Sequence, residues 1–386
     1  MTLAQMGTDV YLPSFPAIKM ALLTTTTFVQ LTFSVFLAGF AVSQLIYGPL
    51  SDRFGRKPFL LIGVSLYFLT SIIAATTSSI YVLLIARTIQ GMGAGACSVI
   101  PRAIMQDHFS GKELERINIY QSMTWSLVPI LAPLMGSYIQ HYLGWRFNFI
   151  FLAIISFSAL IFIIMFKESI KERETSLTIR QVITHYKKVV FHNQFFANLV
   201  CAISVVGILA AFNVSAPILI QETLHLSSLQ YGWSIFIVGM SFLIGALLNR
   251  FLMSRGWLGN HIASIGIGLV SIAVLTLVAC GAFKNFNVWM LLFPIMIMQV
   301  GSALIFPNNS TKALQYFPNI AGKAAAIFGC SLFLGSTITS GIISVLPTES
   351  LIPLSLVILI ITVIMLTAHL KILAHESLLS QGEDNV

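Results

Sequence analysis

The chain has 386 residues, of which 57% are hydrophobic and only 9% are charged, where about 25% charged is usual for a soluble globular domain. So few charged side chains cannot cover the surface of a soluble fold of this size, so the sequence predicts an integral membrane protein. The composition excludes a disordered protein, a disulfide-built secreted domain, a nucleic-acid-binding protein and nearly all water-soluble enzymes.

Apolar runs long enough to cross a bilayer as helices recur along the whole chain, since about 20 helical residues cover the hydrocarbon core. They are too long and too uniformly apolar for the strands of a membrane barrel. We expect twelve transmembrane helices, over residues 1–17, 28–50, 58–77, 80–103, 118–140, 146–166, 195–217, 228–249, 260–282, 286–308, 321–345 and 350–371. Few residues precede Asp9, so either the first span is short at its cytoplasmic end or the natural start lies upstream of Met1.

The loops between these spans carry basic residues in an uneven pattern. If both termini lie in the cytoplasm, all but four of the 21 lysines and arginines fall in cytoplasmic segments. Lys19, Arg146 and Lys284 fall outside, and Arg87 lies within a span. Cytoplasmic loops carry such an excess of Lys and Arg. The formal net charge of +8 therefore reflects the orientation in the membrane, and no nucleic-acid partner is needed to explain it.

A polar segment at 167–194 divides the spans into two sets of six, and we expect a cytoplasmic loop there. Residues 48–53 (GPLSDR) end the second span, and residues 245–250 (GALLNR) end the eighth, at the equivalent inside loop of each half. Such an internal repeat predicts two six-helix bundles related by pseudo-twofold symmetry. The expected bounds are 1–166 for the N-terminal bundle, 167–194 for the loop, 195–371 for the C-terminal bundle and 372–386 for a cytoplasmic tail.

Two charged residues lie deep inside predicted spans, at similar depth from the outer side: Asp9 and Arg87. Ionisable residues within a membrane are costly and mark functional sites by default. Low dielectric disfavours the charged form of a carboxyl group, which suits a group that takes up and releases a proton. We predict that Asp9 carries the coupled proton and that Arg87 sets its proton affinity or binds substrate. The alternatives are a structural acid paired to a neighbouring helix and an arginine that clamps two helices together.

The loop at residues 48–57 (GPLSDRFGRK) is the most specific string in the chain. Its glycines allow a tight turn between antiparallel helices. Asp52 can accept hydrogen bonds from a helix N-terminus, and the two arginines can pair with carboxylates across a bundle interface. Contacts that form in one conformation and break in another would make a gate, whereas a basic loop that only sets topology is the alternative. The predicted gating residues are Gly48, Asp52, Arg53, Gly55 and Arg56.

This loop resembles the motif G-x-L-a-D-r-x-G-r-K of the major facilitator superfamily at nearly every position. Residues 9–16 (DVYLPSFP) resemble the first-span signature of the Bcr/CflA drug-resistance transporters, a branch of the twelve-span drug:proton antiporters. Residues 87–95 (RTIQGMGAG) resemble the superfamily's fourth-span motif, whose arginine is associated with proton transfer. Residues 306–309 (FPNN) and 321–325 (AGKAA) resemble spans 10 and 11 of the same branch. The resemblance covers essentially the whole chain and implies the major facilitator fold.

The fifth predicted span contains residues 129–136 (PILAPLMG), which look like the antiporter motif of that superfamily. Ala132 and Ser137 stand where glycines are usual, so this match is weaker than the others. Small residues and prolines permit close packing and a bend, and an ordinary kinked helix is the alternative. We add Pro129, Pro133 and Gly136 to the predicted gating residues.

Polar residues inside other spans are candidates to bind a substrate, since sites in such folds lie near the midplane between the halves. Each could instead form a hydrogen bond between helices. The predicted substrate-binding residues are Tyr11, Gln44, Tyr47, Gln90, Gln121, Asn213 and Asn308, with Asn198 and Asn309 as further candidates.

The resemblance implies a proton-coupled multidrug exporter of the inner membrane that works by alternating access. We expect a monomer that contacts the lipid bilayer, a small amphipathic substrate and protons. We expect no cofactor, because the proton gradient supplies the energy, and the chain carries no P-loop for ATP. A proton-coupled exporter or importer of a dedicated metabolite, such as a siderophore or a sugar, is the alternative. An enzyme is not expected, because the spans lack a paired set of catalytic groups.

Overall fold

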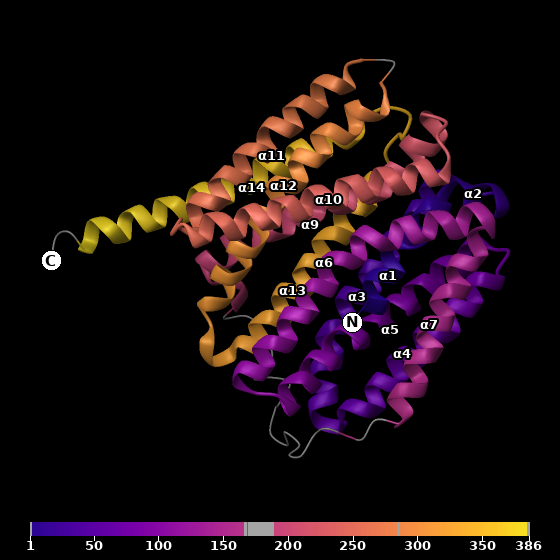
Figure 1. The fold of residues 1–386 in the computed structure, drawn as a ribbon, viewed down its shortest axis with the longest axis horizontal. Coiled ribbons are helices and arrows are strands. Elements are labelled where there is room, and N and C mark those ends of the chain that lie inside the picture. Colours follow the sequence, from indigo (N-terminus) through magenta and orange to yellow (C-terminus); the bar gives the residue numbers. More distant parts are fainter. Residues whose placement is uncertain (1, 166–167, 169–188, 284–285, 384–386) are drawn as a thin grey trace. The chain divides into compact units, whose positions relative to one another are not determined.

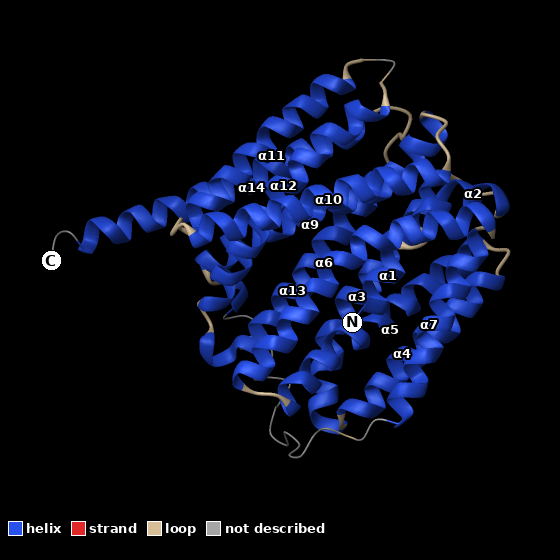
Figure 2. Cartoon of the chain, viewed as in Figure 1, coloured by secondary structure: helices blue, strands red, loops and turns tan. Residues whose placement is uncertain are grey.

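The computed structural model describes residues 2–165, 168, 189–283 and 286–383. Every regular element in these residues is a helix (Figures 1 and 2), which confirms the predicted all-α architecture. Most of the predicted central loop, residues 169–188, lies outside the described residues.

The helices follow one another with short connections. The first half of the chain forms α1 (Thr2–Asp9), the 3-10 turn η1 (Leu12–Ser14), α2 (Phe15–Ala21), α3 (Thr26–Phe54), α4 (Arg56–Thr76), α5 (Ile80–His108), α6 (Gly111–Tyr142) and α7 (Trp145–Met165). The second half forms α9 (Asn193–Ile218), the π-helical turn η2 (Leu219–Thr223), α10 (Ser228–Ser254), α11 (Gly259–Gly281), α12 (Val288–Gln315), the 3-10 turn η3 (Pro318–Ile320), α13 (Ala321–Ser344) and α14 (Ile352–Glu383). α14 continues as a helix through most of the predicted tail.

Ten helices in the described part of the chain are long and apolar enough to span a membrane. The predicted first and fifth spans are not among them. α6 has 32 residues, but polar side chains such as Gln121, Thr124 and Ser126 interrupt its apolar stretch. The count of twelve spans therefore stays a prediction.

The prediction of one continuous helix over residues 1–17 was wrong. The structure has α1, a turn at Val10 and Tyr11, the short turn η1, and then α2. Pro13 contributes to the break, because it has no backbone N–H to donate to the carbonyl of Asp9, four residues earlier. The chain therefore stops being helical directly after Asp9.

The chain folds into two compact units, each described by itself. The first unit comprises Met1–Leu177, Asn213–Phe236 and Ser340–Leu346. The second unit comprises Thr178–Phe212, Ile237–Thr339 and Pro347–Val386. The first unit therefore contains the first half of the chain together with the end of α9, the start of α10 and the end of α13. The predicted division into two bundles at the central loop stays a prediction.

The first unit is built around α5, which packs against α3 and α4. A Cβ atom on Gly91 would collide with the Phe36 carbonyl of α3. A Cβ atom on Gly93 would lie 2.5 Å from the Gly63 carbonyl oxygen of α4. α5 can approach both helices only because it has no side chains at these positions. α1 packs on α5 and α6, which brings it against the helix that carries Arg87.

The second unit pairs α11 with α12 and α14. A Cβ atom on Gly266 would lie 2.7 Å from the Gly301 carbonyl oxygen, so the backbones of α11 and α12 are in direct contact. An apolar cluster forms where α9, α12 and α13 meet. Its buried members are Val189, Phe195, Leu199, Ala202, Ala313, Phe317, Ala324, Ile327, Phe328 and Leu332.

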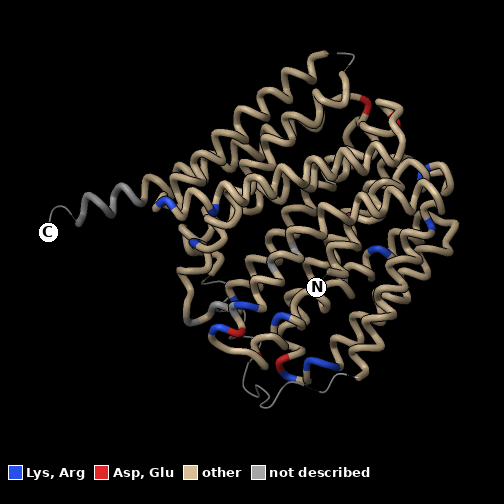
Figure 3. The backbone as a smooth tube through the Cα atoms, viewed as in Figure 1, with Lys and Arg blue, Asp and Glu red and all other residues tan. Residues whose placement is uncertain are grey.

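Charged residues lie mainly at helix ends and in the connections, and the helix middles carry few (Figure 3). Among the described residues, the Asp, Glu, Lys and Arg side chains that are buried are Asp9, Arg56 and Arg87. Burial of a charge is costly unless it is paired or hydrogen-bonded. The surroundings of these three side chains therefore indicate where function lies.

Candidate functional site

Arg87, on α5, has no exposed surface. Its Nη1 donates to Gln90 Oε1 (2.6 Å) and its Nη2 donates to the Gly7 carbonyl oxygen (2.8 Å). The guanidinium also lies over the rings of Tyr11 and Phe36, at 4.1 and 4.2 Å from their centroids. Hydrogen bonds and two aromatic faces thus replace the water that the charge loses on burial.

The Gly7 carbonyl is free for this bond because α1 ends two residues later. The last carbonyls of a helix have no partner within the helix, and the helix dipole favours a cation near them. A side chain at position 7 would interfere, since a Cβ atom there would lie 2.5 Å from the Tyr67 hydroxyl oxygen and 3.0 Å from Phe36 Cζ. Arg87 therefore caps the C-terminus of α1 and links α1 to α5. Such a link between two helices was the structural alternative considered for Arg87.

A chain of polar groups extends from Gln90 across α4. Gln90 Nε2 donates to Ser71 Oγ (2.7 Å), and Ser71 Oγ donates to the Tyr67 carbonyl (2.7 Å). The Tyr67 hydroxyl in turn donates to the Leu3 carbonyl of α1 (2.9 Å). Gln90 is thus part of the support of α1, and the two bonds to α1 backbone carbonyls fix the position of Asp9.

Asp9, the last residue of α1, is only 7% exposed. No described lysine, arginine or histidine forms an ion pair with it. The hydroxyl of Thr8 donates its proton to the Gln5 carbonyl (2.6 Å), so that proton is not available to the carboxyl group. Tyr11 lies within electrostatic range of both Asp9 and Arg87. The carboxyl group is therefore buried without a fixed cation.

Tyr11 lies in the break after α1 and is fully buried. Its hydroxyl lies 3.1 Å from Thr32 Oγ1. Thr32 has one hydroxyl proton and donates it to the Val29 carbonyl (2.6 Å), so the proton between the two hydroxyls comes from Tyr11. The ring packs on Phe15 and Phe149, with centroids 5.4 and 5.5 Å away. Tyr11 thus fills the break after α1.

The other predicted substrate-binding residues of the first unit are not linked by hydrogen bonds to this cluster. Gln44 is buried, and its amide nitrogen has no partner among the described residues. Tyr47 is buried with its ring edge-on to Phe59 (6.3 Å between centroids). Gln121 and Asn213 are partly buried. The unpartnered amide of Gln44 is the one group of these four that is both buried and free to bind a ligand.

Three asparagines of the second half form hydrogen bonds within or between helices, which was the alternative to substrate binding. Asn308 Nδ2 donates to Asn249 Oδ1 (2.8 Å) and to the Leu304 carbonyl (2.7 Å), which ties α12 to α10. Asn309 and Asn198 donate to carbonyls of their own helices. Asn249 is the position that corresponds to Asp52 in the internal repeat.

Arg56 is the centre of the predicted gate. Its Nη1 donates to Asp52 and to Ser51 Oγ (2.9 Å), and its Nε donates to Asp107 Oδ2 (3.0 Å). These contacts join α3, α4 and the end of α5. Arg53 has its guanidinium over the Phe54 ring (5.1 Å) and forms no ion pair with a described carboxylate. Contrary to the expectation of pairs across a bundle interface, the described partners of Arg56 all belong to the first unit.

The N-terminus of α4 is capped by an acid that the sequence did not point to. Glu168 accepts hydrogen bonds from the backbone N–H groups of Arg56 (3.0 Å) and Lys57 (3.1 Å). The expectation that Asp52 would accept hydrogen bonds from a helix N-terminus was wrong here, since its carboxylate turns to the Arg56 side chain. Gly55, at φ 112°, makes room for the cap, because a Cβ atom there would lie 2.7 Å from a Glu168 oxygen.

The predicted gating residues of α6 lie against the break after α1. A Cβ atom on Gly136 would collide with the Val10 carbonyl. Ser137 Oγ donates to the Pro133 carbonyl of the same helix (2.8 Å). Asn148 Nδ2 donates to Ser14 Oγ (2.8 Å), which fixes η1 from α7. Pro129 lies inside α6 one turn earlier. α6 is thus the surface on which the residue next to Asp9 rests.

A polar contact on the predicted outer side was also missed by the sequence. Lys19 Nζ lies 2.6 Å from Glu222 Oε2, and Gln221 Nε2 donates to the Pro13 carbonyl (3.0 Å). The first contact joins α2 to η2, and the second joins η1 to η2; η2 comes from the second half of the chain. The opposite charges at two predicted outside loops were the only signal, and it does not identify a pair.

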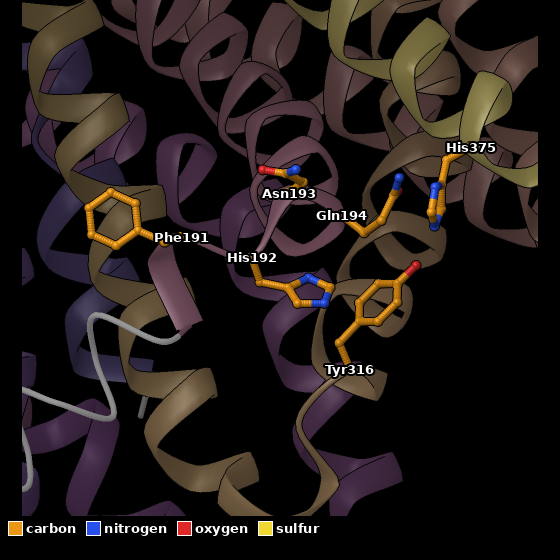
Figure 4. Close-up of a pocket in the computed structure, with 6 residues that line it drawn as sticks. All are labelled: Phe191, His192, Asn193, Gln194, Tyr316 and His375. Carbon is orange, nitrogen blue, oxygen red and sulfur yellow. The ribbon is translucent and has the colours of Figure 1, made fainter.

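A surface pocket of about 480 Å³ lies in the second unit (Figure 4). Its lining residues are Phe191, His192, Asn193, Gln194, Tyr316 and His375. His192 Nδ1 accepts the Phe195 N–H (3.2 Å), so one ring nitrogen is committed to capping α9. None of the predicted site residues lines this pocket. No group of three or more metal-ligating side chains occurs in the part of the chain that the structure describes.

Comparison with known proteins identifies the family of this chain and several relatives. The family model described as Major Facilitator Superfamily matches residues 1–340. "Multidrug resistance protein D" of Escherichia coli (strain K12) is 29% identical, over 89% of this chain and 86% of that protein. The "Chloramphenicol resistance protein" of Pseudomonas aeruginosa is 30% identical, over 91% of this chain and 83% of that protein.

A further relative and a solved structure also match this chain over most of its length. The "Bicyclomycin resistance protein homolog" of Haemophilus influenzae is 24% identical, over 90% of this chain and 87% of that protein. The crystal structure of a D-xylose-proton symporter superimposes with a TM-score of 0.71 at 18% identity, and covers 94% of this chain and 95% of that chain. At that identity the structural likeness establishes the fold alone.

Proposed function

We infer that this chain, which belongs to the Major Facilitator Superfamily, is a multidrug efflux transporter that exports small amphipathic molecules in exchange for protons. The predicted multi-pass architecture, the family and the resistance proteins among its relatives support export. We place it in the inner membrane with both termini in the cytoplasm, as the distribution of basic residues indicates. It acts as a monomer without a bound cofactor, and the proton gradient drives it.

Asp9 carries this proposal. A buried carboxyl group without a fixed cation, at a point where the helix ends, can change its protonation state without breaking an ion pair. Arg87 is occupied by Gly7 and Gln90, so it acts on Asp9 through the electrostatic field and by holding α1 in place. Proton uptake from the outer side and proton release to the cytoplasm would then accompany the two halves of a transport cycle.

Alternating access requires contacts that close each side in turn. On the cytoplasmic side, Arg56 with Asp52 and Asp107 stiffens the first half where the central segment starts at Glu168. On the outer side, Lys19 and Glu222 join the two halves of the chain. The outer contact must break when the transporter opens outward, because its partners lie on helices that then separate.

Drug accumulation in cells tests the proposal. A pump-deficient bacterial host that expresses the protein should accumulate less chloramphenicol and less of a fluorescent lipophilic cation than the empty host. The difference should vanish with a protonophore and with Asp9→Asn, provided that immunoblotting finds the variant in the membrane. Glu113→Gln, which changes an exposed acid in the first turn of α6 outside the proposed proton path, should keep export. Unchanged accumulation of every compound by the wild type would instead favour a transporter of one dedicated metabolite.

A further inference from the structure

Tyr231, on the first turn of α10, is a fully buried residue that the proposed proton path does not yet use. It has no exposed surface, and its hydroxyl has no hydrogen-bond partner among the described residues. Buried polar groups are nearly always hydrogen-bonded, and an exception needs an explanation. A group that bonds only when a neighbouring carboxyl group is ionised is one such explanation.

α6 contacts both the residue next to Asp9 and the residue next to Tyr231. Val10, next to Asp9, rests with its carbonyl on Gly136. The next residue of α6, Ser137, lies against α10, because a Cβ atom on Gly232 would be 2.5 Å from Ser137 Oγ and 2.6 Å from Ser137 Cβ. The neighbours of Asp9 and Tyr231 thus contact consecutive residues of one helix. Tyr231 lies within electrostatic range of Asp9.

The two residues come from different halves of the sequence but from the same compact unit. The described hydroxyl groups around Asp9 are those of Thr8, which donates to the Gln5 carbonyl, of Tyr11, which donates to Thr32, and of Tyr231. Arg87 donates through Nη1 and Nη2 to Gln90 and Gly7, and its buried Nε has no partner among the described residues. Tyr231 is therefore the one hydroxyl donor near the carboxyl group that is still free.

We propose that Tyr231 is a coupling residue whose hydroxyl donates to the ionised carboxylate of Asp9 and so holds the outer side closed while no substrate is bound. This inference rests on the proposed proton-driven export. A phenol donates readily to a carboxylate, and such a charge-assisted bond is stronger than a neutral one. Because α1 and α10 belong to different halves of the chain, the bond opposes their separation on the outer side.

This bond explains how exchange avoids a futile cycle. A carrier that has released its proton inward has an ionised Asp9. If it could open outward empty, it would take up another proton and carry it in without exporting anything. The bond from Tyr231 blocks that return until a substrate enters and competes for Asp9. Removal of the hydroxyl should therefore convert the exchanger into a partial proton leak.

Proteoliposomes with an internal pH-sensitive dye test this directly. An imposed pH gradient without substrate should collapse several-fold faster with Tyr231→Phe than with wild type. Tyr138→Phe, a tyrosine on α6 that is 40% exposed, is the matched control and should behave as wild type. The double variant Asp9→Asn/Tyr231→Phe should abolish the leak, because the proton carrier is then absent.

A second variant reaches the same contact without touching the hydroxyl. Gly232→Ala should loosen the packing of α10 on Ser137 and also give a leak that requires Asp9. A Tyr231→Phe protein that shows no proton leak and still exchanges chloramphenicol for protons would overturn the inference. A leak that persists in the variant without Asp9 would overturn it as well. A wild type that shows no substrate-driven proton movement would instead overturn the proposed function itself, so the two failures are distinguishable.

Discussion

The contacts of the buried Arg87 side chain require an arginine rather than a lysine. Arg87 must reach the Gly7 carbonyl and the Gln90 amide oxygen in different directions while its plane lies on two aromatic rings. A planar guanidinium with five donors does this, and a lysine ammonium does not. The side chain is therefore a structural cap of α1.

Arg87→Lys should lower the free energy of unfolding by about 1–3 kcal/mol, because at least one buried acceptor loses its partner. Export should fall as well, since α1 then holds Asp9 less firmly. Thermal unfolding of the purified protein in detergent measures the first effect. Arg102→Lys, at an exposed position of the same helix, should leave the unfolding temperature unchanged. Equal stability of the two variants would contradict the capping role.

The sequence identified Asp9 and Arg87 because charged residues in apolar spans are rare and costly. It did not reveal that the two fail to pair. Partner choice depends on where α1 ends, which involves Pro13, and on the absence of a side chain at Gly7. It also missed Tyr231 and Glu168, because a tyrosine near a helix start and an acid in a polar stretch carry no signal until neighbouring helices are in place.

At the scale of elements, α6 is the helix that organises the site. It supports the break after α1 at Gly136 and the start of α10 at Ser137. The sequence grouped Gly48 and Gly136 together as gating glycines. The structure separates them: a Cβ atom on Gly136 would collide with the Val10 backbone, whereas one on Gly48 would meet nothing within 4 Å.

Gly136→Ala should destabilise the protein by about 1–3 kcal/mol, since a backbone carbonyl cannot move aside as a flexible side chain can. Gly48→Ala should be neutral or stabilising by up to about 1 kcal/mol, because alanine is the better helix former. Chemical or thermal unfolding of the two variants side by side checks this. A Gly136→Ala protein as stable as wild type would show that α1 and α6 do not approach as described.

The contact between α2 and η2 is a second element-scale feature with its own test. Lys19→Glu should place two acids together and speed outward opening, and Lys19→Glu/Glu222→Lys should restore the wild-type rate. The side chains are about one-third exposed, so we expect a coupling of only about 0.2–1 kcal/mol. Export rates of the four proteins of this double-mutant cycle measure it. Additive single effects would show that the pair does not close the outer side.

At the scale of the whole molecule, composition and the hydropathy pattern alone predicted an all-α membrane protein, and ten described helices meet the length and apolarity required. Runs of about 20 apolar residues predict transmembrane helices reliably, because that length is needed to cross the hydrocarbon core of the bilayer. The first predicted span is not one continuous helix, because a proline interrupts it. It also contains Asp9, a charged residue that lowers its mean hydropathy. The fifth was placed correctly as a helix, but its polar side chains lower its mean hydropathy.

The central claim is that Asp9 carries the proton exchanged for substrate. Its most direct test is the proton movement that follows addition of chloramphenicol to proteoliposomes with no imposed gradient, recorded with an internal pH-sensitive dye. Wild-type protein should move protons against the direction of substrate movement, and Asp9→Asn should show none while still binding chloramphenicol in equilibrium dialysis. Substrate-driven proton movement of wild-type size in Asp9→Asn would contradict the claim.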